Sequence, residues 1–392
     1  MIILKLAYRN LAGAGLRTWL NVFVLSFTYV LIIWHQGLFS GMQQMASHEY
    51  VKDEIAGGQY WVSDYDPYDP LSLDSSHSKI PGKLKAMIEK NHAVPVLIRQ
   101  GTIYPEGRMQ TVMIKGIEPG QKILNIPSEK LYSRAEMPVM IGKLMAKKNG
   151  FKKGDIVTIR WRDSNGTFDA ADGEIVEIMD TNVPTIDSGQ LWLPISKVQE
   201  MFRLEDEATI VTVDQEKVEL PPIGGWLFRD HDYLLKDFND MIRSKRIGGI
   251  VLYTILLFLS MLAIFDTQVL AIFRRRKEIG TLMALGMVRP RVITLFTVEG
   301  AMHGLLGIAI AALYGIPVLI VSAKTGIPIP ESMNAAEEFG FAFTTRLFPA
   351  YSPFLVGITV AIVMATVTVV SYLPSRKISG LKPTEALKGK ML

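Results

Sequence analysis

The sequence predicts an α-helical membrane protein with four transmembrane helices plus an α+β extracytoplasmic domain. Of its 392 residues, 49% are hydrophobic and 20% are charged, so very apolar and quite polar parts coexist. Four long runs are almost free of charged residues. The segment 42–246, by contrast, is rich in aromatic and β-branched residues and in turn signals, as a folded domain is.

The four apolar runs are long enough to cross a bilayer, which needs roughly 20 residues. They cover residues 18–41, 247–273, 292–322 and 353–373. One such run could be a buried helix of a soluble protein, but four runs flanked by basic residues favour membrane spans. The first run is longer than the roughly 7–15 apolar residues of a cleavable signal peptide, so we expect it to be retained.

Lys and Arg are distributed asymmetrically among the short loops. Segments 1–17, 274–291 and 374–392 carry three, six and five of them, whereas segment 323–352 carries two. Basic loops stay in the cytoplasm. We therefore expect a cytoplasmic elbow helix at 1–17, both termini inside, and segment 42–246 and the hairpin 323–352 outside. The protein would be a multi-pass protein of the inner (cytoplasmic) membrane, with its large domain in the periplasm.

The outer segment contains short strand-like runs and a few helical ones. Turns are expected at Gly154-Asp155 and Asn165-Gly166. Helices are expected at 78–91, 142–149 and 195–202. The strand-like runs are "VPVLIRQGTIYP", "MQTVMIKGI", "GDIVTIRW", "GEIVEIMDT" and "ATIVTVD".

An apolar helical face precedes the second span and predicts a helical stalk. Its residues follow the i, i+1, i+4, i+7, i+8 spacing of one helix face. They are Leu234, Leu235, Phe238, Met241 and Ile242. Gly248-Gly249 is expected to loosen the joint with the span, and the first span continues outward in a similar way. Two such helices could couple motion on the two sides of the membrane, whereas the simpler interpretation is a tether.

The loop between the second and third spans predicts a short amphipathic helix. Ile279, Leu282 and Met283 lie on one face, Gly286 can end the helix in a left-handed conformation, and Pro290 suits the first turn of the next helix. Two interpretations stay open. The helix could lie in the membrane interface, or its apolar face could insert into a groove of a partner protein.

Three polar residues and a stripe of glycines lie inside the predicted spans. Asp266 and Glu299 are intramembrane charges, for which we favour a structural or coupling role over ion transport; Arg274 and Arg291 could reach them. His303 lies one turn after Glu299 and is expected to form a hydrogen-bonded pair with it. The stripe predicts close helix packing and consists of Gly300, Gly304 and Gly307.

Several functional classes lack their motifs in this sequence. Cysteine is absent and the six histidines include no pair at metal-ligand spacing, so no metal site is expected. Neither the phosphate-binding G-x-x-x-x-G-K-[ST] loop nor the G-x-S-x-G nucleophile elbow occurs. A formal charge of +4 does not indicate nucleic-acid binding. The chain is therefore not expected to be an enzyme or to hold a cofactor itself.

The stretch "RRRKEIGTLMALGM" resembles the segment after the second span of MacB/LolC/FtsX-type ABC transporter permeases. Further likenesses are "AYRNL…LRTWL", "MIGKLMAKKNGFKKGDIVTI", "SGQLWLPISKVQEMF", "VEGAMHGLLG" and the closing "LPSRKISGLKPTEALK", where Ile378 replaces the usual Ala. In the family, the first stretch is a coupling helix that contacts the ATPase. The residues that match its motif are Arg276, Glu278, Ile279, Gly280, Ala284, Leu285 and Gly286.

The resemblance implies a permease that works by mechanotransmission. Because the ATPase motif is missing here, the likeness is to LolC/LolE, with ATP and Mg on a separate ABC ATPase subunit. The other implied partners are a second permease, the same or paralogous, membrane lipids and a periplasmic lipoprotein carrier. Lipoprotein release from the inner membrane is the preferred function. The alternatives are MacB-like efflux of peptides or drugs and FtsX-like transmembrane signalling to a cell-wall hydrolase.

Overall fold

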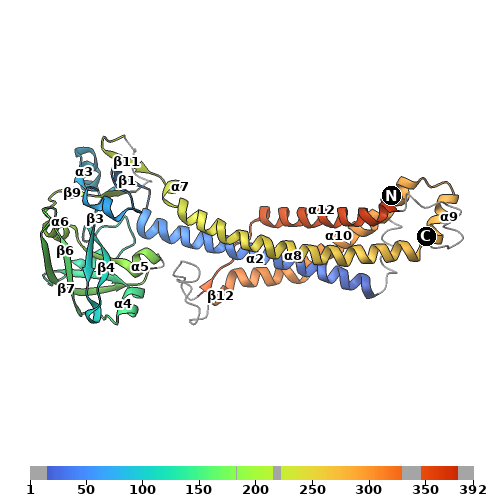
Figure 1. Ribbon diagram of the computed structural model, residues 1–392, viewed down its shortest axis with the longest axis horizontal. Coiled ribbons are helices and arrows are strands. Elements are labelled where there is room, and N and C mark those ends of the chain that lie inside the picture. Colours follow the sequence, from blue (N-terminus) through green and yellow to red (C-terminus); the bar gives the residue numbers. More distant parts are fainter. Residues whose placement is uncertain (1–15, 182, 215–221, 329–345, 378–392) are drawn as a thin grey trace. The chain divides into compact units, whose positions relative to one another are not determined.

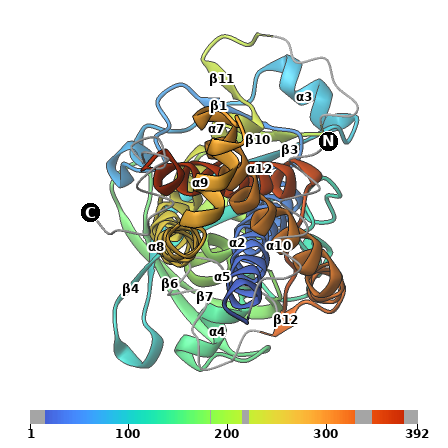
Figure 2. The ribbon, with the colours of Figure 1, turned by 90° about the vertical axis from the view of Figure 1, so that its right-hand side faces the viewer.

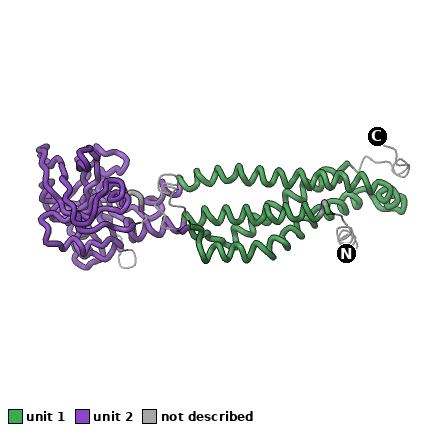
Figure 3. The backbone as a smooth tube through the Cα atoms, turned by 90° about the horizontal axis from the view of Figure 1, so that it is seen from below, with its two compact units in different colours: residues 1–43, 241–328, 347–392 green, residues 44–240, 329–346 purple. Residues whose placement is uncertain are grey.

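The computed structural model describes residues 16–181, 183–214, 222–328 and 346–377. The expected elbow 1–17, most of the hairpin 323–352 and most of the tail 374–392 lie outside these residues. The chain forms two compact units (Figure 3). The helical unit comprises residues 1–43, 241–328 and 347–392, and the sheet unit comprises residues 44–240 and 329–346.

Four long helices form most of the helical unit and are seen roughly along their axes in Figure 2. They are α2 (Leu16–Tyr50), α8 (Lys236–Arg274), α10 (Arg289–Thr325) and α12 (Pro353–Arg376). In the described residues, these four are long and apolar enough to span a membrane. Together with the sheet-rich second unit, they confirm the predicted fold class. The unit also contains the short helix α9 (Arg276–Ala284) and strand β12 (Ile327–Pro328), and β13 (Arg346–Leu347) begins at its boundary.

The helices that lead out of the first and second spans are longer than the spans predicted from the sequence. Helix α2 continues to Tyr50 and into the π-helix η1 (Val51–Ile55). Helix α8 is continuous through Gly248 and Gly249, so the expected loosening there was wrong: each glycine costs only about 1 kcal/mol relative to alanine, which a helix of 39 residues tolerates. A break occurs earlier, at Leu235, which separates α7 (His231–Leu234) from α8.

The four long helices pack through small residues and polar pairs. A Cβ atom on Gly300 would lie 2.1 Å from the Ser371 hydroxyl of α12, so only glycine permits this approach. Thr28 of α2 and Ser260 of α8 share a hydrogen bond of 2.9 Å, and His35 Nδ1 lies 2.8 Å from the Tyr253 hydroxyl. Such pairs satisfy polar side chains where water is scarce.

The sheet unit is built on nine strands in the order β11-β1-β10-β3-β4-β8-β5-β7-β6. Strand β3 also pairs with β6, which closes six of the strands on themselves, from β3 through β4, β8, β5 and β7 to β6. The sheet is mixed, since β4 with β8 and β5 with β7 are parallel pairs. The strands are β1 (Gln59–Val62), β3 (Ala93–Ile103), β4 (Gln110–Ile117), β5 (Pro138–Gly142), β6 (Ile156–Arg162), β7 (Phe168–Met179), β8 (Gln190–Pro194), β10 (Ile210–Val213) and β11 (Trp226–Arg229).

Strand alternation separates two apolar cores on the two faces of this sheet. Leu97, Ile114 and Ile141 belong to the core inside the closed strands, and Ile98 and Trp192 belong to the core on the outer face. The expected helix 195–202 is α6 (Ile195–Phe202) and that at 142–149 is α4 (Lys143–Asn149). The other helical segments are α3 (Gly82–Glu89), α5 (Pro184–Gly189), η2 (Pro70–Asp74), η3 (Pro105–Gly107) and η4 (Ser128–Leu131).

One predicted helix boundary was wrong. The helix expected at 78–91 starts only at Gly82, because Ser78–Lys79 forms strand β2, which pairs with β9 (Glu207–Ala208). Backbone hydrogen bonds to a distant strand thus override the local helical pattern.

Candidate functional site

Helix α9 lies between α8 and α10 and is bounded by sharp turns (Figure 1). Gly286 has a φ of +94°, as the sequence predicted, and its N–H donates to the Met283 carbonyl over 3.1 Å. Pro290 occupies the first turn of α10. Only short turns therefore connect α9 to the end of α8 and to the start of α10.

Arg275 fixes the position of α9 against α10. Its Nε donates to Glu278 over 2.7 Å, and its Nη1 contacts both carboxylate oxygens of Glu299 at 3.1 and 2.9 Å. The guanidinium also lies 5.0 Å from the centre of the Phe296 ring. Glu299 is only 8% exposed, so Arg275 supplies its charge partner. The sequence had indicated Arg274 or Arg291 for this role.

The apolar face of α9 is directed into the chain itself. Ile279 is fully buried and packs with Ile272, Val292 and Phe296. Leu282 and Met283 are half-buried. A role of Ile279 as a contact for a partner's groove was therefore wrong: the ends of α8 and α10 lie close enough to cover it. Leu282 and Met283 offer only part of their surface.

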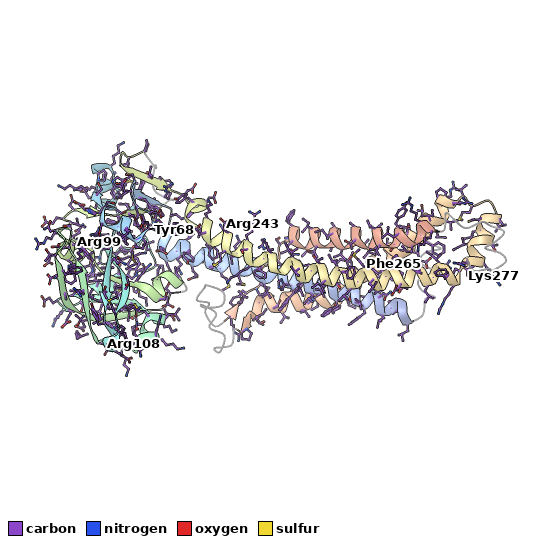
Figure 4. All side chains as sticks on the ribbon, in the orientation of Figure 1. Tyr68, Arg99, Arg108, Arg243, Phe265 and Lys277 are labelled. Atoms are coloured by element: carbon purple, nitrogen blue, oxygen red, sulfur yellow. The ribbon has the colours of Figure 1, made fainter. Side chains whose placement is uncertain are left out.

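Other side chains of the α9 segment remain accessible. Leu285, the residue that follows α9, is 81% exposed. Lys277, labelled in Figure 4, and Glu278 are also exposed. Arg276 is half-buried, and its guanidinium lies 4.4 Å from the centre of the Phe273 ring. The surface that this segment offers thus includes one large apolar side chain, Leu285, and the charged side chains of Lys277 and Glu278.

The stalk residues of the sheet unit pack against the end of α2. Leu235 is 9% and Phe238 is 8% exposed, and the Phe238 ring centre lies 5.6 Å from that of Tyr50. Leu234 is half-buried. In the helical unit, Met241 is half-buried and Ile242 is 1% exposed.

The π-helix η1 anchors α2 in the sheet unit through consecutive residues. The Lys52 carbonyl accepts from the Asn125 N–H over 2.9 Å. Asp53 is 3% exposed and accepts from Asn125 Nδ2 at 3.1 Å and from the Thr181 hydroxyl at 3.0 Å. Glu54 accepts from Lys115 Nζ over 2.6 Å. π-Helical turns often mark functional positions.

Sequence reasoning missed this anchor, which we call the stalk anchor and define as Lys52, Asp53 and Glu54. The signal was present, since a run of charged residues follows directly on a long apolar helix. The sequence does not show which residues contact each carboxylate, because these partners lie 61 to 128 positions further along the chain.

Comparison with known proteins finds a family that resembles the C-terminal part of the chain. The model of the FtsX-like permease C-terminal family matches residues 250–383, which include most of α8, all of α9 and α10, and α12. This part of the chain is similar to the FtsX-like permeases. This confirms the resemblance to MacB/FtsX-type proteins that the sequence motifs indicated.

Two further likenesses accompany the family match. The ABC transporter permease YtrF of Bacillus subtilis (strain 168) is 27% identical over 157 residues, which cover 39% of this chain and 35% of YtrF. The match thus spans about a third of the length of that relative. The extracellular domain of the noncanonic ABC-type transporter YknZ from Gram-positive bacteria is 14% identical, with a TM-score of 0.27, over 41% of this chain and 84% of that domain.

The polar residues within the predicted spans have different surroundings. His303 is 4% exposed, and its Nδ1 lies 3.0 Å from the backbone carbonyl of Glu299, so the two residues are hydrogen-bonded as expected, through the Glu299 backbone. The Glu299 carboxylate is bound by Arg275 instead. Asp266 is exposed on α8, and within the described part of the chain its carboxylate makes no ion pair.

The glycine stripe of α10 faces two neighbouring helices. Gly300 and Gly304 approach Ser371 and Met364 of α12, and Gly307 approaches Leu25 of α2. All three glycines are buried. Among the described residues, no group of three or more His, Asp and Glu side chains is arranged to hold a metal ion.

Proposed function

We propose that this FtsX-like permease is the membrane subunit of an ATP-driven ABC transporter and that helix α9 docks on a separate ATPase chain. The supporting observation is Leu285, an 81% exposed side chain directly after a helix that Arg275 and Ile279 fix to its own chain. A helix that is fixed to its own chain can transmit a movement of the ATPase to the long helices, whereas a loosely attached helix would move without displacing them. ATP and Mg belong to the partner chain.

In this proposal the termini and α9 face the cytoplasm and the sheet unit lies outside the inner membrane. The support is the distribution of basic residues, fourteen of which lie in the three segments assigned to the cytoplasm against two in the hairpin 323–352. ATP-driven movement of α9 would then reach α8 and α2, and α2 ends in the stalk anchor of the sheet unit.

A second permease chain, identical or paralogous, would cover the exposed face of α8. Ile255, Leu259 and Leu262 are 52%, 54% and 49% exposed and lie on the same face as Asp266. A charged side chain at the centre of a span costs roughly 2.5–3.5 kcal/mol when it faces lipid, and such residues almost always face protein or water. The Asp266 carboxylate therefore favours a protein-covered face over a lipid-covered one.

The proposed cargo is a lipoprotein or a similar amphiphile taken from the outer leaflet, with a periplasmic lipoprotein carrier as acceptor. This part of the proposal rests on the resemblance of the motifs to LolC/LolE. Co-purification of the intact complex, with the bound cargo identified by mass spectrometry, tests it. A bound lipoprotein supports the proposal, whereas a bound peptide or drug, or a cell-wall hydrolase in place of cargo, contradicts it.

The docking of α9 is tested by pull-down of the ATPase that co-purifies with the tagged chain from its host. Burial of a leucine side chain is worth roughly 1.5–3 kcal/mol, so Leu285→Glu should weaken binding by about tenfold or more. Lys277→Gln should have little effect, because exposed ion pairs contribute only about 0–1 kcal/mol. Undiminished recovery of the ATPase with Leu285→Glu, in protein of normal thermal stability, would contradict the docking.

A further inference from the structure

A third of the residues that line one pocket of the sheet unit are aromatic. It has a volume of about 310 Å³, at the lower end of the range of small-molecule sites. We call it the aromatic pocket. Its five aromatic lining residues are Tyr50, Trp61, Tyr65, Tyr68 and Tyr233.

The walls of the aromatic pocket come from the parts of the sheet unit that lead to the long helices. Tyr50 is the last residue of α2, and Glu54 belongs to the stalk anchor. Tyr233 and Leu234 are the last two residues of α7. Figure 4 shows Tyr68 on the side of the sheet unit from which α2 and α7 extend. A molecule in the pocket would therefore touch both connections at once.

The charged side chains inside the pocket neutralise one another. Lys115 is 5% exposed, and its ammonium donates to Glu54 over 2.6 Å and lies 5.0 Å from the centre of the Trp192 ring. Lys236 and Asp237 add one charge of each sign and are exposed. The formal charges of the lining residues thus balance, and the electronegative faces of the aromatic rings contribute to the local potential beside them.

Two observations on neighbouring groups point to a cation as the ligand. The guanidinium of Arg229 already lies 4.1 Å from the ring centre of Tyr233 and 5.8 Å from that of Trp61, so rings of this cluster do attract a cation. Burial raises the pKa of Tyr65, and the nearby carboxylates of Glu54 and Asp66 raise it further. Burial penalises a charge of either sign, whereas the effect of the two carboxylates disfavours negative charge specifically and so favours a cation.

We propose that the aromatic pocket binds an organic cation, with an alkylammonium or guanidinium group held against the ring faces. An anionic ligand would be repelled by the electronegative ring faces, and the ammonium of Lys115 is already paired with Glu54. The bound cation would link the end of α2 to α7, and so couple ligand occupancy to the connections between the sheet unit and the long helices. This site goes beyond the proposed transport function, because binding requires no ATPase.

The test uses the purified full-length chain in a maltoside detergent, without ATPase. Binding of choline is titrated by ligand-observed saturation-transfer NMR and compared with that of 3,3-dimethylbutan-1-ol, its neutral isostere. Choline should bind at least about threefold more tightly, because cation–π attraction acts on the charged probe alone. Equal binding of the two probes, or no binding of choline, would overturn the proposal.

Variants of Tyr68 separate the ring face from general apolar contact. Tyr68 is 75% exposed, so its replacement should not disturb the fold. Tyr68→Leu should weaken choline binding roughly 2- to 30-fold, and Tyr68→Phe should keep it within about twofold. Tyr132→Leu, at a tyrosine of 73% exposure outside the pocket, should leave it unchanged. Choline binding that is unaffected by Tyr68→Leu, or equally weakened by Tyr132→Leu, would overturn the assignment of the site.

Discussion

Arg275 contacts two carboxylates and one aromatic ring in the loop between the second and third spans, and this geometry predicts a strong coupling between Arg275 and Glu299. Arg275→Gln should lower the thermal stability of the detergent-solubilised protein, because hydrogen bonds to charged groups are worth about 1.5–3 kcal/mol and Glu299 would lose its charge partner. The double variant Arg275→Gln with Glu299→Gln should recover part of this loss, since no unpaired charge then remains. Strictly additive effects of the two changes would contradict the pairing.

A second prediction at the scale of single residues concerns pH. Asp187 is 3% exposed and accepts from the Leu144 N–H over 2.9 Å at the start of α4. Burial raises the pKa of this carboxyl, although backbone hydrogen bonds partly oppose the change. The folded protein thus binds the proton more tightly than the unfolded chain does. The contribution of Asp187 to the free energy of unfolding should fall as pH rises from the ordinary aspartate pKa through the raised one.

The measurement is the thermal stability of the wild type minus that of Asp187→Asn, across this pH range. The variant keeps an oxygen that can accept from Leu144 but has no proton to release. The difference should decrease as pH rises. A difference in stability that stays constant, or that increases with pH, would show that the pKa of the Asp187 carboxyl is not raised in the folded protein.

At the scale of elements, the two faces of α9 should respond differently to mutation. Ile279→Ala should destabilise the protein by about 2–5 kcal/mol even without ATPase, because it leaves a cavity in the core formed with Ile272, Val292 and Phe296. Leu285→Ser should leave the stability nearly unchanged, because Leu285 is exposed. Thermal melting of the two purified variants measures this contrast. Equal stability of the two variants would show that Ile279 is not buried in this core.

The exposed face of α8 makes a separate prediction about a second copy. The sequence has no cysteine, so a single Leu262→Cys variant can be cross-linked by mild oxidation in native membranes. It should form a covalent dimer, or a product with a paralogous chain if that chain carries a cysteine facing it. Leu305→Cys on α10, at a site of similar exposure, is the control and should not cross-link. The reverse pattern would place the interface on α10.

The sequence was sufficient to predict long elements but not the contacts between distant ones. The four long helices follow from apolar runs, and the left-handed turn at Gly286 follows from the residue itself. The closure of the sheet through β3 and β6 has no local signal, because it depends on pairing Gly101 with Trp161. Likewise, the periodicity around Ile279 correctly gives an apolar face, but only the packing of α8 and α10 shows that their own chain covers it.

At the scale of the whole molecule, the orientation that we propose in the membrane rests on charge alone and can be tested by labelling. A cysteine at Ser164, in an exposed turn of the sheet unit, should react with an impermeant thiol reagent in intact spheroplasts. A cysteine at Lys277 on α9 should react only after the membrane is permeabilised. Labelling of Lys277→Cys in intact spheroplasts, with Ser164→Cys protected, would reverse the proposed topology.

The central claim is that the nucleotide state of the ATPase changes the position of the sheet unit through α9, α2 and α8. The most direct measurement is electron–electron resonance between spin labels at Ser164→Cys in the sheet unit and Ile316→Cys on α10, in the permease–ATPase complex. The distance distribution should shift between the nucleotide-free and the ATP-trapped complex, and Leu285→Glu should abolish the shift. Identical distributions in the two nucleotide states of the wild-type complex, with ATPase bound, would contradict the account.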